Sequence, residues 1–273
     1  MSESTAVRSV RDAVAGAAAV LGEAGCDTPR LDAELLVAEA ARAARERLFL
    51  DPDAALGPDE EARLAELLRR RAARAPVAYI LGHRAFRRLE LAVDRRALIP
   101  RPETELLVEV ALEQPHGAWV HDVGTGSGAV ALALADERPD LRVTASDASK
   151  AALEVAAGNA RHLGLAVELV VHRGLPPHAA GADLIVANLP YVAELEWEGL
   201  APEITLYEPR EALVAGADGL EAIRELVGAA PSGARVAVEH APHQAEAVRS
   251  LLAAARSHRD LAGRERVTAG AVP

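Results

Sequence analysis

The chain of 273 residues has little cysteine, few aromatic residues and no long hydrophobic run. Cys26 is the single cysteine, which excludes an internal disulfide framework and a metal site built from several cysteines. Aromatic residues make up 3% of the chain, so alanine, leucine and valine must supply most of the core. No stretch of about 18 uncharged apolar residues is present, and the N-terminus lacks a basic segment followed by an apolar one. We therefore expect a cytoplasmic protein without a membrane partner.

Positive charge is also scarce. The chain has 30 lysine and arginine residues against 41 aspartate and glutamate residues, which gives a formal net charge of −11. A protein that coats DNA or RNA needs a basic face to neutralise phosphates, so the composition argues against a stable nucleic-acid partner and leaves room only for a local basic patch. The basic run Arg69–Arg71 with Arg74 is interpreted as a solvated helix end, with contact to RNA or to an acidic partner as the alternative.

The length and a hydrophobic content of 50% suffice for about two domains. Residues 5–74 carry apolar residues at helical spacing, which predicts three or four short helices. After Pro76 the pattern changes to alternating apolar residues, typical of a strand or hairpin, up to Pro100. Residues 103–113 then predict an amphipathic helix. We therefore predict three parts, namely a helical domain at 1–75, a β-hairpin connector at 76–101 and a larger domain at 102–273.

From residue 118 onward, short apolar strands alternate with helices. This order predicts an α/β fold with a parallel sheet that is covered by helices on both faces. The predicted strands are 118–123, 142–147, 166–172, 182–188 and 234–240, and the predicted helices are 128–137, 149–163, 219–229 and 242–256.

A glycine-rich turn at Asp122–Gly128 joins the first of these strands to the next helix. Glycines there allow a tight turn and a close approach of ligand to backbone, and the helix N-terminus offers unpaired N–H groups. The glycine spacing fits a dinucleotide fingerprint less well, and no cluster of cations for a pyrophosphate follows. Asp147 ends the next strand, where a carboxylate can accept both hydrogen bonds of a ribose diol. The combination predicts S-adenosylmethionine as cofactor, with a mere tight turn as the alternative. The predicted cofactor-binding residues are Gly124, Thr125, Gly126, Ser127, Gly128, Asp147 and Asn188.

A second motif, Asn-Leu-Pro-Tyr at Asn188–Tyr191, follows an apolar strand at the carboxyl edge of the predicted sheet, where doubly wound folds place ligands. The side-chain oxygen of Asn188 can accept one N–H of a planar amide or amine, and the carbonyl of the next residue can accept the other. The following proline restricts that residue to extended conformations, and the tyrosine can stack on the flat group. The motif predicts methyl transfer to nitrogen by positioning, with an ordinary loop as the alternative. The predicted catalytic and substrate-binding residues are Asn188, Leu189, Pro190 and Tyr191.

No metal centre is predicted. His240 and His243 straddle a strand end, and no third ligand has a suitable spacing. His121 is interpreted as a residue of the sheet and not as a catalytic base. Glu103 and Glu105 are explained by the helix start, with a place in the cofactor cleft as the alternative.

Over nearly its whole length the chain resembles the HemK/PrmC family of protein-(glutamine-N5) methyltransferases. The stretches that carry the likeness are Arg30–Leu36, Pro76–Gly82, Leu98–Glu105, Asp122–Gly128, Asp147, Asn188–Tyr191, Tyr207–Arg210 and Asp218–Leu220. The resemblance implies an S-adenosylmethionine-dependent methyltransferase (Rossmann-like) sheet of seven strands and an N-terminal domain that helps to recognise the substrate. It also implies that the substrate is the glutamine of the Gly-Gly-Gln motif in class I peptide-chain release factors. We expect the enzyme to be a monomer.

Two departures from the family pattern bear on these expectations. The family motif is Asn-Pro-Pro-Tyr, whereas Leu189 occupies the second position here; the accepting carbonyl survives but the loop loses rigidity. After the third strand, His172–Gly174 replaces the usual acidic residue and its large neighbour, so adenine contacts are not transferred there. Two alternatives stay open: methylation of another protein glutamine or a nucleobase amino group, and a non-catalytic binding module with the same fold.

Overall fold

The computed structural model describes residues 8–273 and divides into two units. The first unit comprises the described residues up to Gly82 together with Ala201–Tyr207. The second comprises His83–Leu200 and Glu208–Pro273. The hairpin predicted as a connector groups with the second unit, and Ala201–Tyr207 groups with the first. The N-terminal residues that bear on a targeting signal lie outside the described part of the chain.

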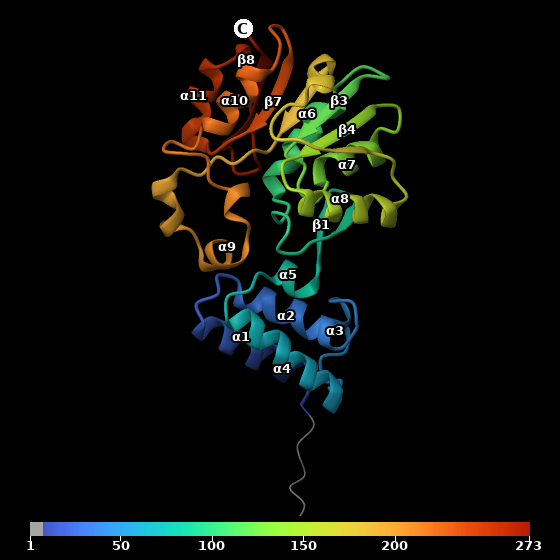
Figure 1. Ribbon diagram of the computed structural model, residues 1–273. Helices are drawn as coiled ribbons and strands as arrows, with labels where there is room; N and C mark the ends of the chain where they lie inside the picture. Colours follow the sequence, from blue (N-terminus) through green and yellow to red (C-terminus); the bar gives the residue numbers. More distant parts are fainter. Residues whose placement is uncertain (1–7) are drawn as a thin grey trace, which may run out of the picture. The chain divides into compact units, whose positions relative to one another are not determined.

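The first unit is helical, as the spacing of its apolar residues predicts (Figure 1). Its core is built mainly from alanine, leucine and valine on facing helices, with the lone thiol of Cys26 buried among them. Burial raises the pKa of that thiol. The helices are α1 (Val10–Glu23), α2 (Pro29–Ala40), α3 (Arg47–Leu50), α4 (Pro58–Ala72), α5 (Val77–Leu81) and α9 (Pro202–Tyr207).

The interpretation of the basic run as a solvated helix end is wrong for two of its four arginines. Arg71 is 5% exposed, and its guanidinium lies 2.7 Å from the carboxylate of Asp32 and 2.7 Å from that of Glu203. Arg74 lies 2.6 Å from the same glutamate. These pairs attach Ala201–Tyr207 to the bundle. A charge run read from sequence does not show partners about 130 residues away.

The predicted strand or hairpin between residues 77 and 100 is partly wrong. Val77–Leu81 is helix α5, which begins after Pro76 and ends where Gly82 adopts a positive φ of 83°. A hairpin does follow, with β1 (His83–Phe86) paired antiparallel to β2 (Leu89–Ala92). A five-residue helix is too short for apolar periodicity to distinguish it from a strand.

The second unit contains a seven-stranded sheet within the described residues, in the order β5-β4-β3-β6-β7-β9-β8. The first five strands in that order run parallel, and β9 pairs antiparallel with both neighbours. This confirms the α/β fold class and the seven strands. The strands are β3 (Trp119–Val123), β4 (Arg142–Asp147), β5 (Glu168–Val171), β6 (Leu184–Ala187), β7 (Arg235–Glu239), β8 (Ala253–Arg259) and β9 (Glu265–Ala271).

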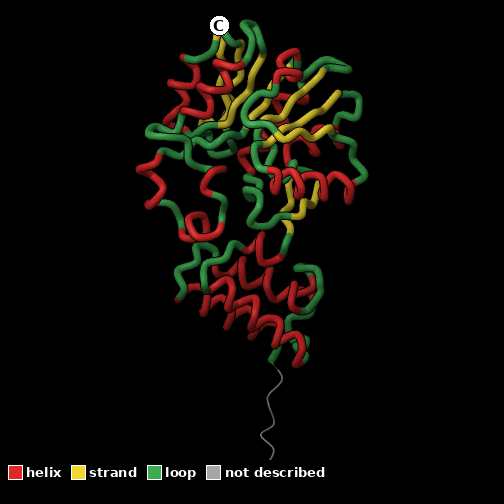
Figure 2. The backbone as a smooth tube through the Cα atoms, viewed as in Figure 1, coloured by secondary structure: helices red, strands yellow, loops and turns green. Residues whose placement is uncertain are grey.

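Helices cover both faces of this sheet (Figure 2). Along β6, Leu184 and Val186 face one core, whereas Ile185 and Ala187 face the other, because successive strand side chains point to opposite faces. The helices are α6 (Glu105–Leu112), α7 (Ala129–Glu137), α8 (Lys150–Leu163), α10 (Glu221–Ala229) and α11 (Ala245–Ser250). Short 3-10 turns are η1 (Pro102–Thr104), η2 (Pro177–Gly181), η3 (Glu194–Gly199), η4 (Arg210–Ala212) and η5 (Pro242–Gln244).

The last predicted helix, 242–256, is wrong at its C-terminal end. The chain forms η5 and α11 and then turns into strand β8 at Ala253, where Ala254 has a positive φ of 51°. Strand β9 has no counterpart among the strands predicted from alternation. Both strands depend on pairing with β7 and with each other, which local sequence patterns do not show.

Candidate active site

The strand order reverses between β3 and β6, and the two predicted motifs meet at this point. The chain runs outward from β3 through β4 to β5, then returns to place β6 on the other side of β3. Val123 of β3 pairs with Ala187 of β6, so Gly124 and Asn188 follow directly on neighbouring strands. Crevices at such a switch point are where open α/β sheets bind ligands.

A cavity of about 420 Å³ opens at this edge of the sheet. Its size falls in the range of small-molecule sites, roughly 300 to 1,000 Å³. Six predicted site residues contribute to its wall, together with residues that follow the hairpin, β4 and β5 and residues of α10. The lining includes Gly124, Gly126, Asp147, Asn188, Leu189 and Pro190, and also Arg96, Ala97, Leu98, Val123, Ser149, His172, Arg173, Gly174, Pro209, Glu211, Ala212, Ala222 and Glu225.

The glycine turn has the conformation that its composition predicts. Gly124, Gly126 and Gly128 have φ angles of 76°, 57° and 87°, in the left-handed region that side chains disfavour. A Cβ on Gly124 would also lie 3.2 Å from Leu189 in the second motif. Gly128 does not line the cavity. A Cβ there would lie 2.9 Å from Leu132 of α7 and 3.2 Å from Ala156 of α8, so the absence of a side chain lets the start of α7 approach α8 closely.

Asp147 ends β4 and lines the cavity. One of its carboxylate oxygens accepts the backbone N–H of Gly126 at 2.8 Å, and the other accepts that of Ser149 at 2.8 Å. Burial raises the pKa of this carboxyl, and these hydrogen bonds oppose that effect. A carboxylate has about four acceptor positions, so two remain for hydroxyl groups of a ligand. The cavity and its acceptors therefore fit an adenosine-type cofactor.

Thr125 and Ser127 are buried and turn away from the main cavity. Thr125 donates its hydroxyl to the carboxylate of Asp122 at 2.6 Å, below the glycine turn. Both residues line a smaller neighbouring cavity of about 50 Å³, which Asn188 also lines. Asp122 is fully buried, and this burial raises its pKa to about 7.

The orientation of Asn188 is set by a residue that the sequence did not single out. Its side-chain Nδ2 donates a hydrogen bond to the hydroxyl oxygen of Thr104 at 2.9 Å. This leaves Oδ1 of Asn188 as the acceptor at the junction of the two cavities. Thr104 belongs to the Ile-Pro-Arg-Pro-Glu-Thr-Glu stretch, so its presence in the resemblance was the available signal.

Hydrogen bonds to residues outside the cavity lining hold the loop that follows Asn188. The backbone carbonyl of Tyr191 accepts a hydrogen bond from Gln244 at 2.9 Å, and the same amide reaches the carbonyl of Asp218 at 3.2 Å. Gly219 has a φ of 73°, and a Cβ there would overlap the carbonyl of Tyr191. The hydroxyl of Tyr191 donates to Glu239 at 3.2 Å. Tyr191 is not part of the cavity lining, and its stacking on substrate stays a prediction.

The other candidates lie outside this cavity. His121 is a buried residue of β3 whose ring contacts the hydroxyls of Thr144 and Ser146, and burial lowers its pKa to about 4. Glu103 and Glu105 lie in η1 and at the start of α6 and are absent from the lining. Across residues 8–273, no group of three or more His, Cys, Asp or Glu could hold a metal ion. None of the helices described is long and apolar enough to cross a membrane.

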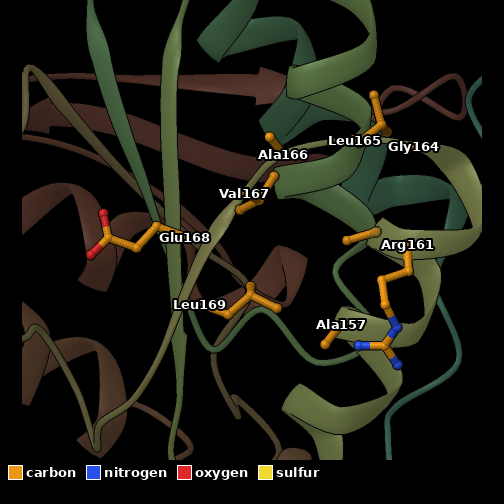
Figure 3. Close-up of a pocket in the computed structure, with 9 residues that line it drawn as sticks. Ala157, Arg161, Gly164, Leu165, Ala166, Val167, Glu168 and Leu169 are labelled. Carbon is orange, nitrogen blue, oxygen red and sulfur yellow. The ribbon is translucent and has the colours of Figure 1, made fainter.

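A second hollow, of about 550 Å³, lies between α8 and the edge strand β5 (Figure 3). Short apolar side chains line most of it, and the side chains of Arg161 and Glu168 extend to opposite sides. It contains none of the predicted site residues and lies away from the switch point.

Two models of known protein families match the chain. Residues 12–82 match the model of the PrmC N-terminal domain, and residues 102–217 match the methyltransferase small domain. A solved 16S rRNA methyltransferase of T. thermophilus, in complex with AdoMet and guanosine, is 18% identical with a TM-score of 0.50 over 70% of this chain and 50% of that chain. It shares the fold. The fold and the site together define an S-adenosylmethionine-dependent methyltransferase.

Relatives of similar length are more specific. The release factor glutamine methyltransferase of Cereibacter sphaeroides is 41% identical over 96% of this chain and 98% of that protein. The protein of the same name from Bordetella pertussis is 42% identical over 89% of this chain and 94% of that protein. The chain belongs to the family of release factor glutamine methyltransferases.

Proposed function

We propose that this enzyme methylates the side-chain amide nitrogen of the glutamine in the Gly-Gly-Gln motif of class I peptide-chain release factors. The observation that supports this most directly is the Asn188–Thr104 hydrogen bond at the cavity. It orients the side-chain oxygen of Asn188 as an acceptor next to the glycine turn, where the substrate N–H would arrive.

The amide group of glutamine is planar, and its nitrogen is a weak nucleophile because its lone pair is delocalised. Two acceptors, Oδ1 of Asn188 and the carbonyl of Leu189, would hold both N–H groups in one plane. When bound, the cofactor would supply a methyl group on a sulfonium sulfur to the face of that plane. The amide nitrogen would gain the carbon that the sulfur loses and would release one proton to solvent. The contribution of the residues is therefore orientation and electrostatic stabilisation.

Gly124, Gly126 and Asp147 would bind the cofactor. The first two leave the backbone open to the ligand, and the carboxylate accepts the ribose hydroxyls. Arg173 and Glu225 contribute charge of both signs to the lining, which suits the amino and carboxylate groups of the methionine part. Leu189 stands where the family motif Asn-Pro-Pro-Tyr has its first proline. Because the accepting group is the backbone carbonyl, this difference leaves the acceptor in place.

The direct test uses the enzyme, a class I release factor and S-adenosylmethionine with a labelled methyl group. We expect label on the glutamine of the Gly-Gly-Gln motif, located by mass spectrometry of the digested factor. The matched control is a factor in which that glutamine is replaced by alanine, which should acquire no label. Label on nucleic acid, or on both factors equally, would contradict the proposal.

We further propose that the enzyme acts in the cytoplasm as a monomer, with the release factor as its protein partner and without stable binding to nucleic acid or membrane. The net charge of −11 supports the absence of a nucleic-acid partner. Light scattering after size-exclusion chromatography should give the mass of one chain, 28.6 kDa. A concentration-independent dimer mass would contradict this.

A further inference from the structure

A buried ion pair lies beside the smaller cavity and has no assigned role. The side chain of Glu208 is 2% exposed, and its Oε1 lies 2.5 Å from Nη2 of Arg101. The other oxygen, Oε2, accepts the backbone N–H of Ile99 at 3.2 Å. Both carboxylate oxygens of Glu208 therefore hold the same short segment, residues 99–101, at positions two residues apart.

The segment held in this way is part of the wall of the site. Leu98 lines both cavities, and residues 99–101 line the smaller one together with Asn188. Pro209, which follows Glu208 in the chain, lines the main cavity. The ion pair thus joins two stretches of the wall that are 107 residues apart in sequence.

The same segment supports the residue that orients Asn188. The backbone carbonyl of Arg101 accepts the N–H of Thr104 at 3.1 Å in the turn η1. The hydroxyl oxygen of Thr104 in turn accepts the hydrogen bond from Nδ2 of Asn188 at 2.9 Å. A displacement of residues 99–101 would therefore move Thr104 and change the direction in which Oδ1 of Asn188 points.

We propose that Glu208 is a positioning residue whose carboxylate holds residues 99–101 in the place from which Thr104 orients the side chain of Asn188. This inference rests on the proposed function, since it concerns the same acceptor. It goes beyond that function because it assigns a role in methyl transfer to a carboxylate that lines neither cavity.

The argument follows from the number of acceptors that Glu208 supplies. A carboxylate has two accepting oxygens, whereas a carboxamide of the same shape has one oxygen and an NH2 group that only donates. In Glu208→Gln the NH2 group must face either the guanidinium of Arg101 or the N–H of Ile99, and two donors form no hydrogen bond. The segment then loses one of its two attachments. Because the side chain of Arg101 is 28% exposed, it can turn to solvent, and we expect the variant to fold.

A second ion pair of the same unit provides a matched control. Arg87 and Glu137 form two hydrogen bonds of 2.8 Å, and their side chains are 18% and 7% exposed. Neither residue lines either cavity. Glu137→Gln therefore removes a comparable ion pair without touching the site, and both variants should melt at a lower temperature than the wild type. A purely structural role for Glu208 predicts that the two variants behave alike at the site as well.

The first test observes the side chain of Asn188 and needs no turnover. Its two 15N–H cross-peaks, identified by their absence in Asn188→Asp, report the hydrogen bond to Thr104. They should shift or broaden in Glu208→Gln and coincide with those of the wild type in Glu137→Gln. Wild-type positions in Glu208→Gln, or equal shifts in both variants, would overturn the proposal.

The second test separates methyl transfer from cofactor binding. In Glu208→Gln the kcat for methylation of the release factor should fall about 10- to 100-fold, because a small displacement of a positioning group has an effect of that size. The affinity for S-adenosylhomocysteine, measured by calorimetry, should stay within about threefold of the wild type, since Gly126 and Asp147 keep their contact. Glu137→Gln should keep the wild-type kcat. An unchanged kcat in Glu208→Gln, or an equal loss in Glu137→Gln, would contradict the positioning role.

These outcomes separate the two proposals. If the wild type methylates the release factor and Glu208→Gln keeps its kcat, the inference fails and the proposed function stands. If no release factor is methylated but the cross-peaks of Asn188 shift in Glu208→Gln and not in Glu137→Gln, the proposed function fails and the positioning role stands.

Discussion

Replacing Asp122 with asparagine should change how the stability of the second unit depends on pH. Asp122 is 2% exposed, and its carboxylate accepts a hydrogen bond from the hydroxyl of Thr125. Its pKa rises from the ordinary value of 3.8 to about 7, first because of burial and further because of the charge of Asp147. The hydrogen bonds from Thr125 and the backbone of Ala131 oppose this shift.

The sign follows from proton binding. Between pH 3.8 and about 7 the folded state keeps the proton on Asp122 and the unfolded state has lost it. Stability therefore falls as pH rises across this window and levels off above it. The full effect corresponds to about 4 kcal/mol, at 1.36 kcal/mol for each pH unit between the two pKa values. About 2 kcal/mol of it lies between about pH 5.5 and about pH 8.5.

The assay is urea unfolding followed by tryptophan fluorescence. The two tryptophans, Trp119 and Trp197, both belong to the second unit, so the signal reports that unit alone. The difference in unfolding free energy between Asp122→Asn and the wild type should move by about 2 kcal/mol in favour of the variant from about pH 5.5 to about pH 8.5. A constant offset between the proteins does not matter, because only the change with pH is tested.

The matched control is Asp136→Asn, which removes an exposed aspartate of α7 in the same unit. Its difference from the wild type should stay within about 0.5 kcal/mol over the same range. If Asp122→Asn behaves like this control, then Asp122 is ionised at an ordinary pKa in the folded protein. The explanation that burial below the glycine turn keeps its carboxyl protonated is then refuted.

Three further substitutions have defined outcomes. Gly219→Ala places a methyl group against the carbonyl of Tyr191 and should lower kcat roughly tenfold or more with the circular dichroism spectrum retained; wild-type turnover would contradict the support role of this turn. Gly124→Ala, at a φ of 76°, should weaken S-adenosylhomocysteine binding about tenfold by calorimetry, since a left-handed residue costs about 1–2 kcal/mol; unchanged affinity would argue against it. Glu203→Gln weakens the buried ion pair of Arg71 and should destabilise the helical unit by about 3 kcal/mol in thermal denaturation, and equal melting curves would show that the pair contributes nothing.

The sequence contained enough information for the fold class and for the centre of the site. Strands such as Leu184–Ala187 are short, fully apolar and separated by helices, which is the pattern of a sheet buried on both faces. Gly124 and Asn188 could be assigned to one edge because parallel strands end together. That their strands are adjacent needed the structure.

What could not be predicted depends on contacts between distant residues. Thr104 and Glu239 accept hydrogen bonds from Asn188 and Tyr191, which lie 84 and 48 residues away from them in the chain. No local sequence pattern indicates either contact. Strand β9 exists because β7 and β8 pair with it. Arg71 looked like a surface charge because its neighbours in sequence are charged, whereas its partners come from another helix and from α9. Periodicity reports local exposure, and these are tertiary effects.

The most direct test of the proposed role of Asn188, as an acceptor that holds the substrate amide, is the rate of glutamine methylation by Asn188→Ala. The account predicts that single-turnover methylation of the release factor falls about 100- to 1,000-fold, as when one preorganised hydrogen-bonding group is removed from an active site. Calorimetry should show S-adenosylhomocysteine bound within about threefold of the wild-type affinity, because the glycine turn and Asp147 are untouched. A variant that methylates the Gly-Gly-Gln glutamine at the wild-type rate would contradict the central claim that Asn188 holds the reacting nitrogen.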